Sequence, residues 1–130
     1  MQFSRINICF AIVFFIMVSC SAQNNNVVEF PPEKFHAEIK NHPGILVDVR
    51  TPKEFSNGYI AGAININLFD DDFSEKILKL DSSKTIYVYC ASGGRSSEAA
   101  ELLLKSGFKN VYNLEGGITR WKKGNLPVEK

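Results

Sequence analysis

Short runs of β-branched and aromatic residues alternate along this chain with segments in which apolar residues have a helical spacing. Strands connected through helices run parallel, and a parallel sheet is covered by helices on both faces. The alternation therefore predicts one α/β domain of three layers, α/β/α, with a mainly parallel sheet. The strands are expected at residues 45–49, 63–66, 85–89 and 111–114, and the helices after Pro32, from Thr51, around 73–80, at 96–106 and at 117–122.

Two of the expected helices begin with polar signatures. Thr51, Pro52 and Glu54 form a capping box, with Thr51 at the N-cap, Pro52 at the first helical position and Glu54 at the third. The run of three Asp residues at 70–72 precedes the next helix and lacks the alternating spacing of a calcium loop. We interpret it as a solvated helix start, and the sequence predicts neither a metal site nor another cofactor.

The first 19 residues have the layout of a signal peptide. Arg5 provides a positive start, and residues 8–18 form an unbroken apolar run. As a helix this run spans about 16 Å, which is too short for a bilayer core of about 30 Å. We therefore expect residues 1–19 to be removed, residues 20–28 to form a polar tether, and residues 29–130 to form the domain.

Met17-Val18-Ser19-Cys20 resembles the lipobox of bacterial lipoproteins. That resemblance implies a lipid on Cys20 and export to the bacterial cell envelope, where the protein would be periplasmic and anchored to a membrane. The residues leave open a plain signal peptide cut near Ala22, which would release a soluble protein.

The charge balance argues against nucleic acid as a partner. Without Arg5, the chain carries 14 Lys and Arg residues against 14 Asp and Glu residues, and no basic run stands out. Nucleic-acid binding depends on an excess of positive charge on one face. We therefore expect no nucleic-acid partner.

Cys90 is the one cysteine that the mature domain would keep as a free thiol. Cys9 leaves with the signal peptide, and a lipid would block Cys20. Cys90 then has no partner for an internal disulfide and no second thiolate for a metal. A buried, inert cysteine is the default interpretation, so the neighbouring residues decide.

The residues after Cys90 favour a reactive thiol. A strand ends at Cys90, and the glycines of Ser92-Gly93-Gly94 let successive backbone N–H groups turn inward as an anion-binding nest. Arg95 adds a positive charge close to the start of the next helix. The dipole of that helix, the N–H donors and the guanidinium group all stabilise a thiolate and lower the pKa of the thiol. A glycine-rich turn that merely connects strand to helix is the alternative.

Four motifs resemble those of the rhodanese family of sulfurtransferases and occur in the same order. One of them is the Cys-x-x-Gly-x-Arg-Ser loop at 90–96, and the resemblance covers about residues 29 to 128. It implies a rhodanese-like fold and sulfurtransferase activity. The other motifs are Asp48-Val49-Arg50 with Glu54-Phe55, Gly58-Tyr59-Ile60-Ala61-Gly62-Ala63-Ile64-Asn65-Ile66, and Leu114-Glu115-Gly116-Gly117 followed by Trp121.

By this resemblance, the thiolate of Cys90 takes sulfane sulfur from a donor such as thiosulfate and passes it from a persulfide to cyanide, a thiol or a protein acceptor. Arg95 is the second catalytic residue and holds the donor's oxyanion. Asp48 and Arg50 hold the loop through hydrogen bonds and an ion pair with Glu54, or form a purely structural ion pair. The residues implied to bind substrate are Ala91, Ser92, Gly93, Gly94, Arg95 and Ser96.

The chain departs from the family pattern at two positions. Tyr59 stands where His is common, and Ala91 stands where many relatives have a basic residue directly after the cysteine. Arg95 is therefore the only cationic residue of the loop.

Three other functions compete with this one. Cysteine-dependent phosphatases and arsenate reductases place five residues between Cys and Arg, whereas four separate Cys90 from Arg95, which gives a tighter loop. A non-catalytic docking or sulfur-carrier module is the second alternative. A thiol redox protein is the third, although the chain lacks a Cys-x-x-Cys pair.

Overall fold

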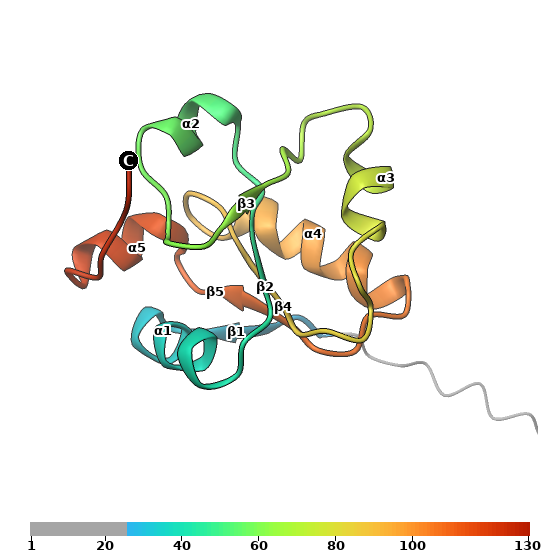
Figure 1. The fold of residues 1–130 in the computed structure, drawn as a ribbon, viewed down its shortest axis with the longest axis horizontal. Coiled ribbons are helices and arrows are strands. Elements are labelled where there is room, and N and C mark those ends of the chain that lie inside the picture. The colour runs from blue at the N-terminus through green and yellow to red at the C-terminus, as the bar shows by residue number, and fades with distance from the viewer. Residues whose placement is uncertain (1–25) are drawn as a thin grey trace, which may run out of the picture.

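The computed structural model describes residues 26–130, which form a five-stranded sheet flanked by helices (Figure 1). The order across the sheet is β1-β5-β4-β2-β3, and all neighbouring strands are parallel. The predicted α/β fold with a mainly parallel sheet is therefore confirmed. The strands are β1 (Val28–Phe30), β2 (Ile45–Asp48), β3 (Ile64–Asn65), β4 (Ile86–Tyr89) and β5 (Val111–Leu114).

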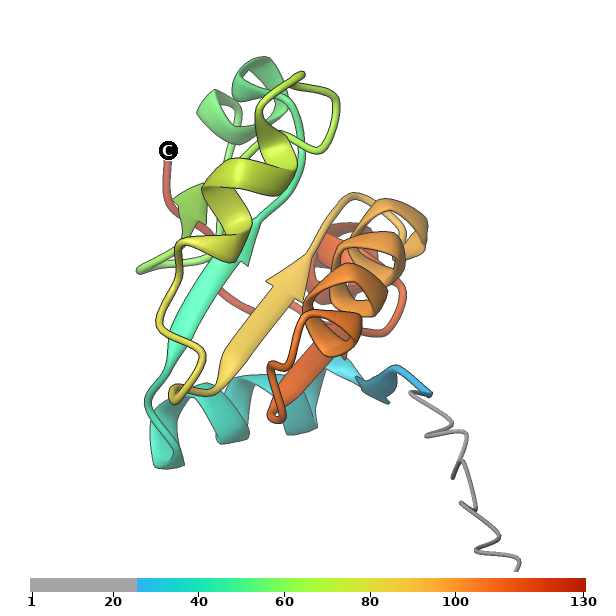
Figure 2. The same ribbon diagram turned by 90° about the vertical axis from the view of Figure 1, so that its right-hand side faces the viewer.

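Helices cover both faces of the sheet, as the three-layer prediction requires. Helices α3 (Phe73–Leu78) and α4 (Gly94–Lys105) pack on one face, in front of the strands in Figure 2. Helices α1 (Pro32–Asn41) and α5 (Gly117–Lys123) pack on the other face. The short helix α2 (Pro52–Ser56) follows β2 and lies beyond the end of that strand.

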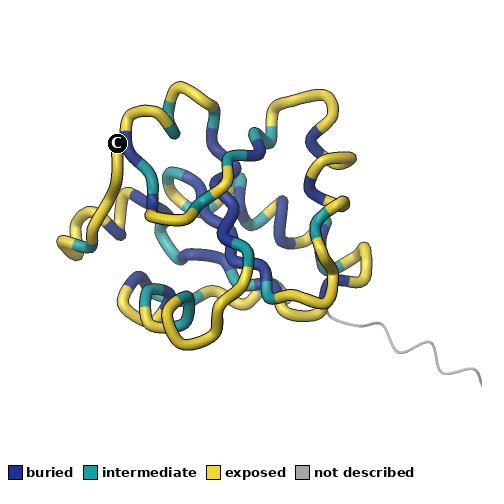
Figure 3. Tube along the Cα trace, in the orientation of Figure 1, coloured by how far each residue is buried: buried dark blue, intermediate teal, exposed yellow. Residues whose placement is uncertain are grey.

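The two faces of the sheet bury different kinds of side chain, because successive residues of a strand point to opposite faces. On β4, Ile86 and Val88 contribute to the core under α3 and α4, and Cys90 joins the same core. Tyr87 and Tyr89 contribute to the core under α1 and α5, which also contains Phe35 and Trp121. Figure 3 shows that the buried residues are concentrated along the central strands. Cys90 is thus attached to a rigid strand.

Strand β1 and the start of α4 are two places where the structure differs from the sequence prediction. Strand β1 was not predicted; it begins one residue before the expected domain start, and Val28 is 47% exposed. Its three residues carry no alternation that identifies a strand, and pairing with β5 is what orders them. Helix α4 begins at Gly94 instead of Ser96, because Gly93 turns the chain at φ 109° and its carbonyl accepts a hydrogen bond from Ser97 N–H.

The predicted capping box at the start of α2 is confirmed: the Thr51 side chain accepts from the N–H of Glu54, and the Glu54 side chain accepts from the N–H of Thr51. The predicted signal peptide, the lipidation site Cys20 and the tether up to residue 25 lie outside the described residues. Within residues 26–130, no helix is long and apolar enough to cross a membrane.

Candidate active site

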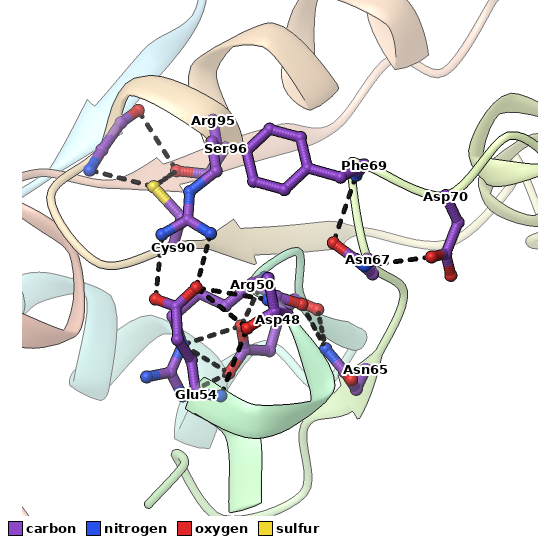
Figure 4. A network of polar contacts seen from close by, with 12 residues as sticks. Asp48, Arg50, Glu54, Asn65, Asn67, Phe69, Asp70, Cys90, Arg95 and Ser96 are labelled. Carbon is purple, nitrogen blue, oxygen red and sulfur yellow. Dashed lines mark hydrogen bonds and ion pairs between the residues drawn. The ribbon is translucent and has the colours of Figure 1, made fainter. Parts of the chain in front are cut away.

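Cys90 lies directly after β4, beside the first turn of α4 (Figure 4). The residue is buried, with 1% of its surface exposed. Its Sγ accepts a hydrogen bond from the backbone N–H of Gly93 at 3.1 Å and another from the hydroxyl of Ser96 at 3.3 Å. Two donors directed at one sulfur atom stabilise the thiolate over the thiol.

The pKa of the Cys90 thiol is set by two opposing effects. Burial raises this pKa, because a charged sulfur loses its hydration. Hydrogen bonds from the Ser96 hydroxyl and from the backbone N–H groups of Ser96, Gly93 and Ser92 lower it. The hydrogen bonds prevail, so the pKa lies below its ordinary value. The site therefore favours a reactive thiolate.

The first turn of α4 shapes the loop around the sulfur. Gly93 is the N-cap of the helix and has a left-handed backbone, which disfavours residues with a Cβ. The hydroxyl of Ser96 also lies 3.2 Å from the carbonyl oxygen of Gly93. Ser96 has only one hydroxyl proton, so it donates either to Gly93 or to Cys90 at any moment. This choice leaves the Ser96 hydroxyl able to respond to charge on the sulfur.

The start of α5 holds the other side of the loop. The N–H groups of Ile118 and Thr119 donate to the carbonyl oxygens of Cys90 and Ala91 at 2.9 and 3.0 Å. Gly117 makes this approach possible, because a Cβ at that position would lie 2.5 Å or less from both carbonyl oxygens. Close packing of α5 on the Cys90 loop thus explains the second glycine of the Gly116-Gly117 motif.

Asn113 is a site residue that the sequence analysis missed. It is buried in β5, and its side-chain amide donates to the carbonyl oxygen of Gly93 at 3.3 Å and to Glu29 Oε1 at 3.1 Å. It therefore connects the edge strand β1 to the Cys90 loop. The signal that could have revealed it is a lone amide in the otherwise apolar run at 111–114.

Asp48 and Arg50 form a buried ion pair at the end of β2. Arg50 donates to the two carboxylate oxygens of Asp48 through Nε and Nη2 at 2.7–3.0 Å, and it also donates to the carbonyl oxygen of Gly58 at 2.7 Å. Burial lowers the pKa of Arg50, but the bonds to Asp48 outweigh this effect and raise it. The pair thereby fastens the segment after α2 to the end of the sheet.

Glu54 pairs with Arg95, and the predicted ion pair between Arg50 and Glu54 is wrong. Both guanidinium Nη atoms of Arg95 donate to the Glu54 carboxylate, at 2.8 and 2.9 Å. The hydrogen bonds from Arg95 lower the pKa of Glu54 to about 2. Arg50 does not pair with Glu54, because the guanidinium group of Arg50 pairs with the carboxylate of Asp48.

The remaining loop residues that were predicted to bind substrate lie around the sulfur in different ways. Ala91 is half-buried, and Ser92 and Gly94 are exposed. The Ala91 carbonyl points to α5, so its contribution to the loop is structural. Arg95 and Ser96 belong to the first turn of α4, with Arg95 on its half-buried side and Ser96 fully buried.

Comparison with known proteins identifies the family. Residues 31–124 match the family described as "Rhodanese-like domain". The chain belongs to the rhodanese-like family. It is 40% identical over 93 residues to thiosulfate sulfurtransferase 16, chloroplastic, of Arabidopsis thaliana, which covers 64% of this chain and 78% of that protein. It is 35% identical over 92 residues to a thiosulfate sulfurtransferase of Stutzerimonas stutzeri, covering 71% and 82%.

The fold of this rhodanese-like domain also matches solved structures. A rhodanese-related protein of Thermoplasma volcanium has a TM-score of 0.70 and 34% identity, covering 78% of this chain and 97% of that one. Two other similar proteins are described differently. A tRNA uridine(34) hydroxylase of Pelagibacter ubique is 32% identical over 82% of this chain, which spans 36% of that protein. A Rhodopseudomonas palustris protein described as "Possible Tyrosine Phosphatase" has a TM-score of 0.70 and 25% identity, covering 82% and 87%.

Phe69 is a second residue of this rhodanese-like domain that the sequence analysis missed. It is 67% exposed, and the centre of its ring lies 5.6 Å from the guanidinium carbon of Arg95. Figure 4 shows its ring directed toward Arg95 from the loop between β3 and α3. The side-chain carbonyl of Asn67 accepts from the N–H of Phe69 at 3.1 Å and so fixes the turn. The result is an apolar surface next to the Cys90 loop.

Proposed function

We propose that this protein is a sulfurtransferase that carries sulfane sulfur as a persulfide on Cys90. The observation that carries the proposal is the environment of Cys90 Sγ, which accepts hydrogen bonds from Gly93 N–H and Ser96 Oγ and has a lowered pKa. A thiolate of this kind is the nucleophile that covalent sulfur transfer requires. The thiosulfate sulfurtransferases of Arabidopsis thaliana and Stutzerimonas stutzeri are similar in sequence, which supports the same chemistry here.

The reaction has two steps. In the first, the Cys90 thiolate attacks the outer sulfur of the donor, a new S–S bond forms, and the donor's own bond to that sulfur breaks. The leaving group departs with the electron pair; from thiosulfate it is sulfite. In the second, cyanide or a thiolate attacks the outer sulfur of the persulfide and restores the Cys90 thiolate. The first step leaves the enzyme modified as a persulfide, and the second step restores it, so ping-pong kinetics are expected.

The neighbouring residues have distinct roles in this proposal. The backbone N–H groups between Ala91 and Ser96 hold the terminal sulfur, and Arg95 stands at the mouth of the site as the second catalytic residue. Asp48, Arg50 and Glu54 keep the surrounding segments in place and touch neither donor nor acceptor. A small molecule is the expected sulfur donor, and the acceptor is a thiol, cyanide or a protein.

The test is the intact mass of the purified protein after incubation with a sulfane donor, beside a Cys90→Ala variant. We expect a gain of about 32 Da, one sulfur atom, which cyanide removes and the variant lacks. No gain with thiosulfate or with an organic persulfide contradicts the proposal. Hydrolysis of a phosphate ester would then favour a phosphatase, and inactivity toward both would favour a docking module.

We also propose that the chain is exported and anchored to a bacterial membrane through lipid on Cys20. The lipobox-like sequence Met17-Val18-Ser19-Cys20 supports this proposal. Processing that is blocked by globomycin, together with partition of the mature protein into detergent, is the expected result. A water-soluble mature protein with a Cys20→Ala variant that is processed normally would contradict it.

A further inference from the structure

The Cys90 site offers little positive charge to a donor. Arg95 is the only cationic residue of the loop from Cys90 to Ser96, and both of its Nη atoms are bound by Glu54. Asp48 balances Arg50 in the same way. The charges of these two arginines and two carboxylates cancel. When Cys90 is a thiolate, the site as a whole therefore has a net negative charge.

A donor's own charge therefore matters for its approach. Thiosulfate is a dianion and has no apolar part, so it meets twice the repulsion that a singly charged donor meets at the same distance. It would also have to displace Glu54 to make a two-bond contact with Arg95. The hydrogen bonds and charge of Arg95 already hold the Glu54 carboxylate, which makes that displacement costly.

The surface beside the loop suits an organic group instead. Phe69 exposes 67% of its surface and faces Arg95, while Cys90 is 1% exposed. Only the slim terminal sulfur of a donor can therefore reach Cys90, and the rest of the donor remains at the mouth, next to Phe69. Covering exposed apolar surface is favourable, and thiosulfate, which has no apolar part, cannot use this contribution.

We propose that the preferred sulfur donor is a low-molecular-weight organic persulfide, R–S–SH, in place of thiosulfate. This inference rests on the proposed sulfurtransferase function. The Cys90 thiolate attacks the outer sulfur, and the bond between the two donor sulfurs breaks. The thiolate R–S⁻ leaves with the electron pair, and the proton stays on the transferred sulfur. The products are Cys90–S–SH and R–S⁻, so atoms, charge and electrons balance without an oxidant or reductant.

Glu54→Gln tests the charge argument. Gln at this position keeps the acceptor that the capping box needs, so α2 is expected to remain intact. The variant frees the charge of Arg95 for the donor. The rate of persulfide formation is measured by intact mass. We expect the second-order rate constant with thiosulfate to rise about tenfold, which is the effect of one unit charge at a few ångströms. With N-acetylcysteine methyl ester persulfide, whose organic group is neutral, we expect a change of less than about threefold.

Phe69→Ala tests the apolar argument. We expect the rate constant with the methyl ester persulfide to fall about fivefold, because the organic group loses most of its apolar contact. The rate constant with thiosulfate should fall by a smaller factor. The matched control is Glu101→Gln, which removes an exposed carboxylate from the far part of α4 and should leave both donors' rates as in the wild type.

The outcomes separate this inference from the proposed function. If Cys90 gains sulfur from both donors but Glu54→Gln changes their ratio no more than Glu101→Gln does, the donor preference is wrong and the sulfurtransferase function stands. If the wild type reacts faster with thiosulfate than with the persulfide, the preference is also wrong. If neither donor adds sulfur to Cys90, both proposals fail.

Discussion

The site contains two arginine–carboxylate pairs that differ in nearly every physical respect. Asp48 and Arg50 are two residues apart, and their side chains are 0% and 5% exposed. Glu54 and Arg95 are 41 residues apart, and their side chains are 35% and 22% exposed. The first pair is local and dry, whereas the second connects α2 to α4 at the surface of the site. The same chemical contact can therefore serve the architecture in one place and the reaction in another.

The difference follows from solvation. A buried charge that loses its partner has no water to replace it, so the protein bears the full cost of desolvation. A half-exposed charge that loses its partner is rehydrated, and the pair contributes little to stability. We therefore expect the Asp48–Arg50 pair to control folding and the Glu54–Arg95 pair to control the properties of the site.

Asp48→Asn should produce the largest change in stability. It leaves the Arg50 guanidinium buried without a counter-charge, and breaking a buried pair in this way costs about 3–5 kcal/mol. Urea unfolding at neutral pH measures the loss. The control is Asp72→Asn, which removes a surface pair with Lys76 whose side chains are about half exposed; it should cost less than about 1 kcal/mol. An equal decrease in the free energy of unfolding in the two variants would contradict the conclusion that the buried pair controls folding.

Glu54→Gln should change stability much less, by less than about 1 kcal/mol, and in a way that depends on pH. The folded-state pKa of Glu54 is about 2, below its ordinary value of 4.5. A lowered carboxylate pKa stabilises the fold fully above the ordinary pKa and loses that effect as the pH falls toward 2. The wild type should therefore have a larger free energy of unfolding than the variant at pH 7, and this difference should become smaller below pH 4.5.

Urea midpoints of both proteins at pH 7, 4.5 and 3 would check this prediction. Arg95 remains charged throughout, so any narrowing reports the carboxylate. A gap that is constant from pH 7 to pH 3 would show that the negative charge of Glu54 contributes nothing, and that the pair is held by geometry alone.

The sequence analysis included a structural Asp48–Arg50 pair as an alternative, but it did not predict the Glu54–Arg95 pair. The Cys90 loop was predictable because its strand, thiol, glycines and arginine are consecutive residues. The partner of Glu54 was not, because Arg95 lies 41 residues away and Arg50 is closer in sequence. The roles of Asn113 and Phe69 were hidden for the same reason, since each depends on a segment that only the folded sheet brings near. Local order along the chain thus predicted the nucleophile, and tertiary contacts decided what surrounds it.

The smallest expected effect concerns the thiol itself and separates charge from hydrogen bonding. The lowered pKa of Cys90 comes from hydrogen bonds from Ser96, Gly93 and Ser92, which overcome the effect of burial. Ser96→Ala removes the hydroxyl donor 3.3 Å from Sγ, so the pKa of the thiol should rise toward its ordinary value. Glu54→Gln leaves these donors in place and should move the pKa less.

Thiolate absorbance at 240 nm, followed as a function of pH, measures both shifts. Ser97→Ala, on the same turn of α4 as Ser96, is the matched control and should titrate like the wild type. A larger shift in Glu54→Gln than in Ser96→Ala would mean that the charge of the outer pair governs the thiolate directly. The Glu54–Arg95 pair would then control the ionisation of Cys90 as well as the binding of the donor.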